Sequence, residues 1–255
     1  MNEEIRRILK MVEDGKISAE EGVRLIEALE QGRKRSRGIF TILDGLDDLG
    51  RGFKGLGTGL GRKEFRFPGA KELDLKGVSG DITIKGDRAD LITITGDGLM
   101  IARESDNRVR IKAMSGDITA VVPEKTNLNL VSASGDVEIS DLSGNLTLKV
   151  AAGDITIKNF SGRIDISGAF GDLDLDLSHL EEGHIKAAFG DIEVGLNPDE
   201  DVEVEVRLKK KGKIANEAGL KEIEKKPGYF LGRSGKGEHR LKIEGERGEV
   251  ILKRR

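Results

Sequence analysis

Gly153-Asp154-Ile155-Thr156-Ile157-Lys158 is the stretch that decides the fold, because close copies of it recur along the middle of the chain. In most copies a Gly-Asp pair precedes an aliphatic residue, and apolar and polar residues then alternate. This alternation is typical of a short strand with one buried face. The copies follow one another at intervals of about 18 residues and begin at Gly80, Gly96, Gly116, Gly135, Gly153, Gly171 and Gly190.

A second glycine-started strand lies midway between some of these copies. Ser143-Gly144-Asn145-Leu146 and Ser161-Gly162-Arg163-Ile164 show the pattern, so each rung has two short strands with glycine at the corners. A single rung cannot bury its apolar face, whereas stacked rungs bury a continuous column and pair each strand with the rungs above and below. The sequence therefore predicts a mainly β protein, a parallel β-helix (β-solenoid) of about seven rungs. The residues predicted to point inward include Ile82, Ile84, Ile118, Val137, Ile139, Ile155, Ile157, Ile164, Ile166, Ile192 and Val194.

The aspartate of each Gly-Asp pair is predicted to accept backbone N–H groups at its corner, as aspartate does in turns. Carboxylates stacked at the rung spacing would repel one another. They must therefore fan out into water or pair with lysine. The denser glycine spacing of calcium-binding repeats is missing from this chain, so we predict no calcium site.

The composition agrees with a narrow aliphatic core. The 255 residues include 35 Gly, one Tyr, no Trp and no Cys, which suits tight corners better than an aromatic-lined cleft. Lack of cysteine excludes disulfides and thiol nucleophiles. No apolar signal core or membrane-spanning stretch is visible, so we expect a cytoplasmic protein that can lie peripherally at the inner face of the membrane.

Residues 1–32 have the pattern of a two-helix hairpin. Ile5, Ile8, Leu9 and Val12 recur at helical spacing, and Ser18-Ala19-Glu20-Glu21 has capping-box spacing. Two such short helices are too small to be stable alone. The hairpin therefore needs a protein partner, a second copy or the solenoid itself. Because it is net acidic, we expect no nucleic-acid partner.

Residues 33–66 form a basic, glycine-rich segment with an apolar stripe at helical spacing. A stripe flanked by positive charge suits an anionic membrane surface, but it also suits a helix that caps the solenoid, a partner-binding helix or a plain linker. The residues predicted to contact a partner or membrane are Ile39, Phe40, Leu43, Leu46, Phe53, Leu60, Arg33, Lys34, Arg35 and Arg37.

Other apparent motifs are weak. Gly50-Arg51-Gly52-Phe53-Lys54-Gly55 has the spacing of a dinucleotide-binding loop, but no strand precedes it. His179 and His184 lie near Glu181 and Glu182, yet two histidines without a further ligand are usually surface residues. We therefore predict no catalytic residue, no cofactor and no metal site.

The rungs from Gly80 to Leu196, preceded by Ile8-Leu9-Lys10-Met11-Val12-Glu13-Asp14-Gly15, resemble the bacterial putative-adhesin family of β-solenoid domains with a SHOCT-like N-terminal hairpin. The resemblance implies a right-handed winding, no known catalytic activity, and a link to the cell envelope and its stress responses. The domains would be the hairpin (1–32), the basic linker (33–66) and the solenoid (67–255). The repeat is irregular from Lys209 to Glu238.

We therefore expect a non-enzymatic scaffold or interaction protein. The alternatives are a self-assembling filament of stacked solenoids and a β-helix protein that binds or processes polysaccharide. Sugar-processing β-helices usually carry long loops and aromatic platforms, which this sequence lacks.

Overall fold

The computed structural model describes residues 63–77, 79–98, 100–197, 199–210 and 212–255. The predicted helical hairpin and most of the basic segment lie outside these residues. The strands are β1 (Lys63–Pro68), β2 (Glu72–Gly77), β3 (Ile82–Asp87), β4 (Leu91–Gly96), β5 (Met100–Ser105), β6 (Arg108–Ala113), β7 (Ile118–Pro123), β8 (Asn127–Ser134), β9 (Val137–Ser140), β10 (Ser143–Ala152), β11 (Ile155–Phe170), β12 (Leu173–Phe189), β13 (Ile192–Leu196), β14 (Val202–Leu208), β15 (Lys213–Asn216), β16 (Lys221–Lys226), β17 (Tyr229–Arg233), β18 (His239–Arg247) and β19 (Glu249–Arg254).

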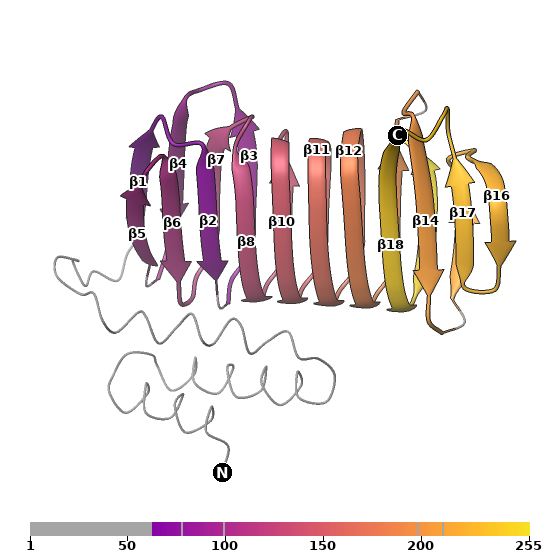
Figure 1. The fold of residues 1–255 in the computed structure, drawn as a ribbon. Helices are drawn as coiled ribbons and strands as arrows, with labels where there is room; N and C mark the ends of the chain where they lie inside the picture. Colours follow the sequence, from indigo (N-terminus) through magenta and orange to yellow (C-terminus); the bar gives the residue numbers. More distant parts are fainter. Residues whose placement is uncertain (1–62, 78, 99, 198, 211) are drawn as a thin grey trace, which may run out of the picture.

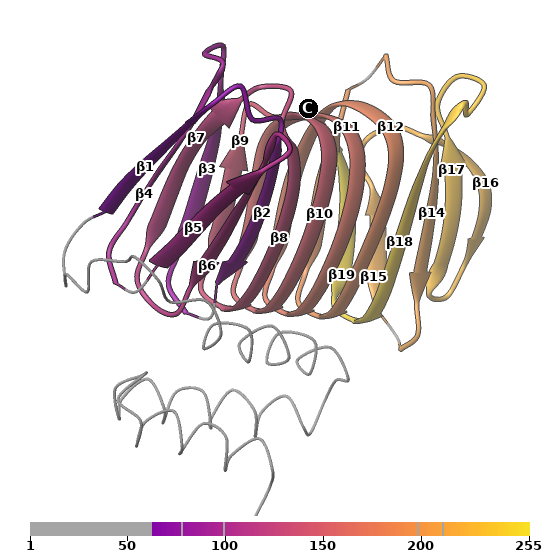
Figure 2. The ribbon, with the colours of Figure 1, turned by 60° about the vertical axis from the view of Figure 1, so that its left-hand side comes forward.

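The strands form two facing ladders joined by corners, as a solenoid requires (Figures 1 and 2). The first face runs in space as β5-β6-β2-β8-β10-β11-β12-β18-β14-β17-β16. The second face runs as β1-β4-β7-β3-β9-β11-β12-β13-β19-β15. The long strands β11 and β12 contribute to both faces because each continues around a corner. The mainly β, solenoid-like fold is thus confirmed, whereas the right-handed winding and the rung count stay predictions.

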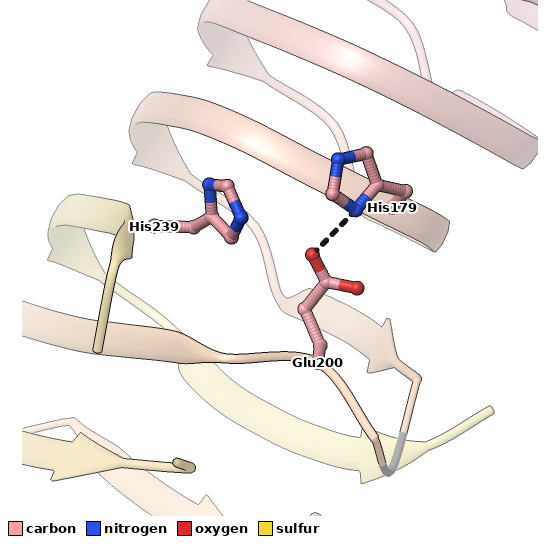
Figure 3. A group of neighbouring side chains, drawn as sticks. All are labelled: His179, Glu200 and His239. Carbon is pink, nitrogen blue, oxygen red and sulfur yellow. Dashed lines mark ion pairs between the residues drawn. The ribbon is translucent and has the colours of Figure 1, made fainter. Parts of the chain in front are cut away.

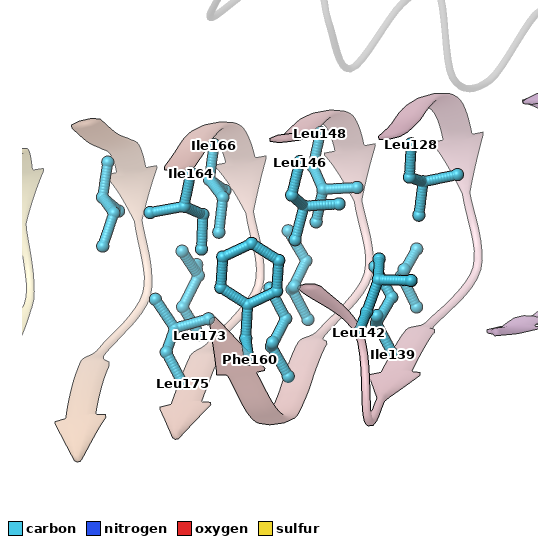
Figure 4. Packing of buried hydrophobic residues seen from close by; sticks show 14 of the residues in the cluster. Leu128, Ile139, Leu142, Leu146, Leu148, Phe160, Ile164, Ile166, Leu173 and Leu175 are labelled. Atoms are coloured by element: carbon cyan, nitrogen blue, oxygen red, sulfur yellow. The ribbon is translucent and has the colours of Figure 1, made fainter. Parts of the chain in front are cut away.

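The core lies between the two faces and is almost entirely aliphatic (Figure 4). Alternate residues of most strands point into it, and every residue predicted to point inward is buried. Parallel pairing places equivalent residues in columns, for example Val137, Ile155 and Leu173. Phe160 and Phe230 are the largest fully buried side chains among the described residues.

Glycine is required at the corners because the backbone is crowded and left-handed there. Gly153 has φ of 130°, and a Cβ on it would lie 2.1 Å from the carbonyl oxygen of Gly135 on the next rung. The midway corners follow the same rule, since Gly144 and Gly162 have φ of 121° and 126°.

The order of strands in space departs from chain order at the N-terminal end. The strand β2 lies between β6 and β8, and β3 lies between β7 and β9, so the first rung along the chain is not the first in space.

The prediction that Gly96 starts a rung is wrong: Gly96 ends β4, which is antiparallel to both β1 and β7. The physical reason is visible in the sequence, because Asp97 is followed by Gly98 instead of an aliphatic residue that could enter the core.

The order of strands in space also departs from chain order at the C-terminal end. In space, β18 lies between β12 and β14, and β19 lies between β13 and β15. The last two strands of the chain therefore separate β12 and β13 from β14 and β15, which come directly after them in the sequence. Within the predicted irregular stretch, β16 and β17 form an antiparallel hairpin packed against β14.

Candidate functional site

The predicted contact residues between Arg33 and Leu60 all lie outside the described residues, so the structure does not place them. The candidate sites that it does place lie on the solenoid. They are the Gly-Asp corner, the outward strand faces, a polar groove at the midway corner and a cluster of two histidines with a glutamate.

The aspartates of the Gly-Asp corner form a continuous ladder of hydrogen bonds between rungs. The backbone N–H of Asp154 donates to Asp136 Oδ1 at 2.9 Å, and that of Asp172 donates to Asp154 Oδ1 at 2.8 Å. The predicted acceptor role of the corner aspartates is therefore confirmed. Each of these bonds gives a carboxylate a partner on the next rung, which offsets the repulsion between stacked charges. The complete ladder runs through Asp97, Asp117, Asp81, Asp136, Asp154, Asp172 and Asp191 and ends at the backbone N–H of Glu249.

The outward faces carry many charges, and these are paired across neighbouring strands. Lys158 Nζ lies 2.7 Å from Glu138 Oε1, and Arg163 Nε lies 3.1 Å from Glu181 Oε2. On the first face, Glu244 lies within ion-pair distance of His184, Lys186 and Lys242. Hydrogen bonding from Lys242 lowers the pKa of Glu244 to about 2. Many charges on these faces are thus paired with one another.

A shallow polar groove lies at the midway corner beside the end of β3. Several of its side chains are already hydrogen-bonded: Asn159 Nδ2 donates to Asp141 Oδ1 at 2.8 Å, and Ser143 Oγ donates to the backbone carbonyl oxygen of Glu124 at 3.1 Å. The groove therefore offers a ligand few free polar groups. It is lined by Gly86, Asp87, Arg88, Glu124, Asp141, Leu142, Ser143, Asn159 and Ser161.

Among the described residues, a group of metal-ligand side chains joins His179, Glu200 and His239 (Figure 3). His179 belongs to β12, Glu200 lies between β13 and β14, and His239 begins β18. His179 Nδ1 lies 2.9 Å from Glu200 Oε1. The two imidazole rings meet edge to face with 5.2 Å between their centroids.

Hydrogen bonds to backbone N–H groups hold Glu200 and the loop before His239 in place. Glu200 is 8% exposed, and its Oε1 accepts the backbone N–H of Leu180 at 3.0 Å. The Asp201 carboxylate accepts the backbone N–H groups of Gly237 and Glu238, which fixes the loop before His239. These bonds, that from Glu238 first, lower the pKa of Asp201.

Sequence reasoning placed His179 beside His184 and found no further ligand. The structure separates them, because His184 faces Glu244 at 3.4 Å while His179 faces Glu200. Glu200 and His239 are distant in sequence, and no local spacing marks them. The one feature of the sequence that marks His179 and His239 is the rarity of histidine, since the chain has 3 His in all.

The repeated core, the two faces and the glycine corners together define a mainly β, solenoid-like protein. The Toastrack DUF4097 family model matches residues 68–253, more than half of the chain, so the chain belongs to this family. A SHOCT-like domain model matches residues 3–34. Both matches agree with the predicted resemblance. No curated protein matches the sequence.

Several solved structures are similar to this chain over most of their own length. A "putative cell adhesion protein" from Clostridium sporogenes has 14% identity and a TM-score of 0.46, covering 76% of this chain and 100% of that one. A "putative adhesin" from Bacteroides fragilis has 12% identity and a TM-score of 0.36, covering 77% and 98%. A "putative lipid binding protein" from Parabacteroides distasonis has 12% identity and a TM-score of 0.33, covering 75% and 96%. These values are too low to transfer a function.

Within the part of the chain that the structure describes, no helix has the length and apolar character needed to cross a bilayer.

Proposed function

We propose that this chain is a non-enzymatic scaffold or interaction protein of the bacterial cell envelope or its stress response. It works in the cytoplasm and contacts the inner face of the membrane peripherally. The solenoid is the rigid part, and residues 1–62 contact a protein partner, a second copy of the chain or an anionic membrane. One observation carries the proposal: many charges on the outward faces of the solenoid are paired with one another, which leaves the basic apolar stripe as the strongest unassigned binding signal.

Because many of its surface charges are paired, the solenoid is better suited to act as a rigid spacer than to bind a charged ligand on its outward faces. An ion pair at a surface contributes little to stability, but it removes the field that would attract a charged ligand. Lys253 illustrates this, because its Nζ pairs with Glu193 and also lies 3.7 Å from Asp174 Oδ1.

Self-assembly into filaments is disfavoured by the ends of the solenoid. Three of the four outermost strands, β5 and β16 on the first face and β1 on the second, pair antiparallel with their neighbours and interrupt the parallel ladder, whereas β15 pairs parallel with β19. The sequence of β16 is KEIEKK, so five of its six side chains are charged. Charged edge strands are the usual protection against pairing between sheets.

The stripe of residues 38–61 supports the membrane contact. Phe40, Leu43, Leu46, Phe53 and Leu60 would bury apolar surface at the interface. The flanking Arg33, Lys34, Arg35 and Arg37 would each add about 1 kcal/mol near an anionic surface. Binding should therefore weaken as salt screens the charge.

The test is cosedimentation of the full chain with vesicles of phosphatidylglycerol and phosphatidylcholine at low salt. We expect binding that falls as the salt concentration rises. Phe40→Asp with Phe53→Asp should abolish it. A matched control is Thr83→Asp with Asn145→Asp, which adds the same negative charge at two exposed positions of the solenoid and should leave most of the binding intact.

Full-length protein that stays in the supernatant at low salt would contradict the membrane contact. A chain that also stays monomeric in sedimentation equilibrium, and that captures no protein through residues 1–62, would contradict the scaffold role itself.

A further inference from the structure

We propose that His179, Glu200 and His239 form a binding site for one divalent transition-metal ion, with zinc as the natural occupant by ligand chemistry. The three side chains each offer one ligand atom, and these atoms all lie within 4.8 Å of one another. Two imidazoles and one carboxylate are a ligand set that zinc accepts, with water in the fourth position. The chain has no cysteine that could compete for the ion.

The spacing of one pair of ligand atoms, His179 Nδ1 and Glu200 Oε1, is close to what a tetrahedral ion needs. Ligands that lie about 2.0–2.1 Å from zinc in a tetrahedral site are about 3.4 Å from one another. His179 Nδ1 and Glu200 Oε1 lie 2.9 Å apart. Because the His179 side chain is 52% exposed, its ring has room to move outward by the fraction of an ångström required. The exposed side also leaves a path for the ion and for a water ligand.

The hydrogen bonds around the cluster select the correct form of His239. His239 Nδ1 lies 3.3 Å from the backbone carbonyl oxygen of Glu181. A carbonyl oxygen only accepts, so this contact favours the neutral tautomer with the proton on Nδ1, in which the lone pair of Nε2 faces away from Glu181. Figure 3 shows this ring directed toward His179 and Glu200. A carbonyl or carboxylate behind the ring is the usual outer contact of a metal-binding histidine.

Glu200 is held in place before any ion arrives. The backbone N–H of Glu200 donates to the carbonyl oxygen of Asn197 at 3.0 Å, and the Asn197 side chain reaches the carbonyl oxygen of Ser178 at 3.4 Å. The turn that carries Glu200 is thereby tied to the strand that carries His179. A carboxylate that is 8% exposed and faces two imidazoles is better compensated by a divalent cation than by one hydrogen-bonded imidazole.

The position of the site gives the ion a structural role. It would connect β12, the β13–β14 turn and β18, the place where β18 is inserted between two strands that precede it in the chain. An ion that binds only the folded arrangement adds its binding free energy to the stability of that arrangement. The metal would therefore fix the strand order at the C-terminal end of the solenoid.

The test uses the full chain, stripped with a chelator and titrated with zinc by calorimetry, with thermal unfolding measured in parallel. We expect one zinc per chain and a higher melting temperature with the ion. Cobalt should give the intense visible absorption of a four-coordinate site.

The variants are His239→Ala, His179→Ala and Glu200→Gln, each of which should weaken zinc binding by about tenfold or more. His184→Ala is the matched control, because it removes the third histidine of the chain, which faces Glu244 instead. That variant should bind zinc like the parent. Circular dichroism of each variant keeps a loss of binding distinct from a loss of folding, and His239 and His179 are exposed enough to be replaced without emptying the core.

Zinc binding that is unchanged in a folded His239→Ala or His179→Ala protein would overturn the proposal. Failure of the stripped parent to bind zinc, cobalt or nickel would overturn it as well. Neither result depends on whether residues 33–60 bind membranes, so this site and the proposed scaffold function fail or succeed separately.

Discussion

The middle of the solenoid and its C-terminal end are held together by different kinds of contact. From β8 to β12 the strands follow chain order on each face, and successive rungs repeat the aliphatic core positions and the Gly-Asp corner, at Gly135, Gly153 and Gly171. From β13 to β19 the order is broken, and individual contacts take over: Asp201 holds the loop before β18, and Lys242, Lys186 and His184 surround Glu244. A repeat is stabilised by its neighbours in sequence, whereas an inserted strand depends on contacts that occur once.

Placing a charge in the core of the middle rungs should have the largest effect. Ile155 is 1% exposed, and Ile155→Lys should lower the free energy of unfolding by about 4 kcal/mol or more, because an unpaired charge would be buried. Thr156→Lys is the matched control, since Thr156 faces outward between Glu138 and Asp174 and should tolerate a positive charge. Urea unfolding of both variants measures the difference. Similar midpoints for the two would mean that the inward column is assigned incorrectly.

A methyl group at a corner glycine should be the next most damaging change. Gly153→Ala would place a Cβ 2.1 Å from the Gly135 carbonyl oxygen at φ of 130°, and we expect a loss of about 3 kcal/mol from strain and overpacking. Gly168→Ala is the control, because its Cβ would meet only Leu173 Cδ1 at 3.7 Å. Thermal unfolding should show a clear loss for the first variant and almost none for the second. Equal melting temperatures for the two variants would show that the corner does not require glycine at position 153.

At the C-terminal end we expect a local effect. Asp201→Ala removes the acceptor for the backbone N–H groups of Gly237 and Glu238. Hydrogen exchange at these amides should become about tenfold faster, since each loses a hydrogen bond to a charged group. The amides of Asp154 and Asp172 in the middle rungs serve as the internal control and should keep their protection. Uniformly faster exchange would show that the two regions unfold as one unit.

The smallest expected effect is a dependence of stability on acid pH. The pKa of Glu244 is lowered from its ordinary 4.5 to about 2 by its hydrogen bond to Lys242 and the neighbouring charges. The unfolded chain therefore takes up this proton first, so the stabilisation is complete above about 4.5 and is lost as the pH falls toward 2. The side chain is 31% exposed, so solvent screening should limit the effect to about 1 kcal/mol.

Glu244→Gln isolates this contribution. The variant should be less stable than the parent at pH 6 and should approach it near pH 2, as measured by urea unfolding at a series of pH values. Parallel curves for the two proteins across this range would show that Glu244 contributes nothing through its charge.

Sequence reasoning succeeded where the relevant contacts repeat. The spacing of Ile155 and Ile157 predicted two buried positions on one strand, and Gly153-Asp154 predicted a corner with an aspartate that accepts a backbone N–H. It failed at Gly96, because Asp97 is followed by Gly98, which has no side chain to enter the core as the aliphatic residue of the other copies does. The predicted stripe from Ile39 to Leu60 stays a prediction.

The sequence by itself determined the class of fold, because a period of about 18 residues with alternating apolar positions has one economical solution, a stack of rungs. Only the tertiary structure decided the order of those rungs and the meeting of His179, Glu200 and His239. The physical reason is that a repeat makes its strands nearly interchangeable in the ladder, so local pattern cannot say which strand lies beside which. Turns and single contacts far apart in the chain choose among those arrangements, and they leave no periodic signal in the sequence.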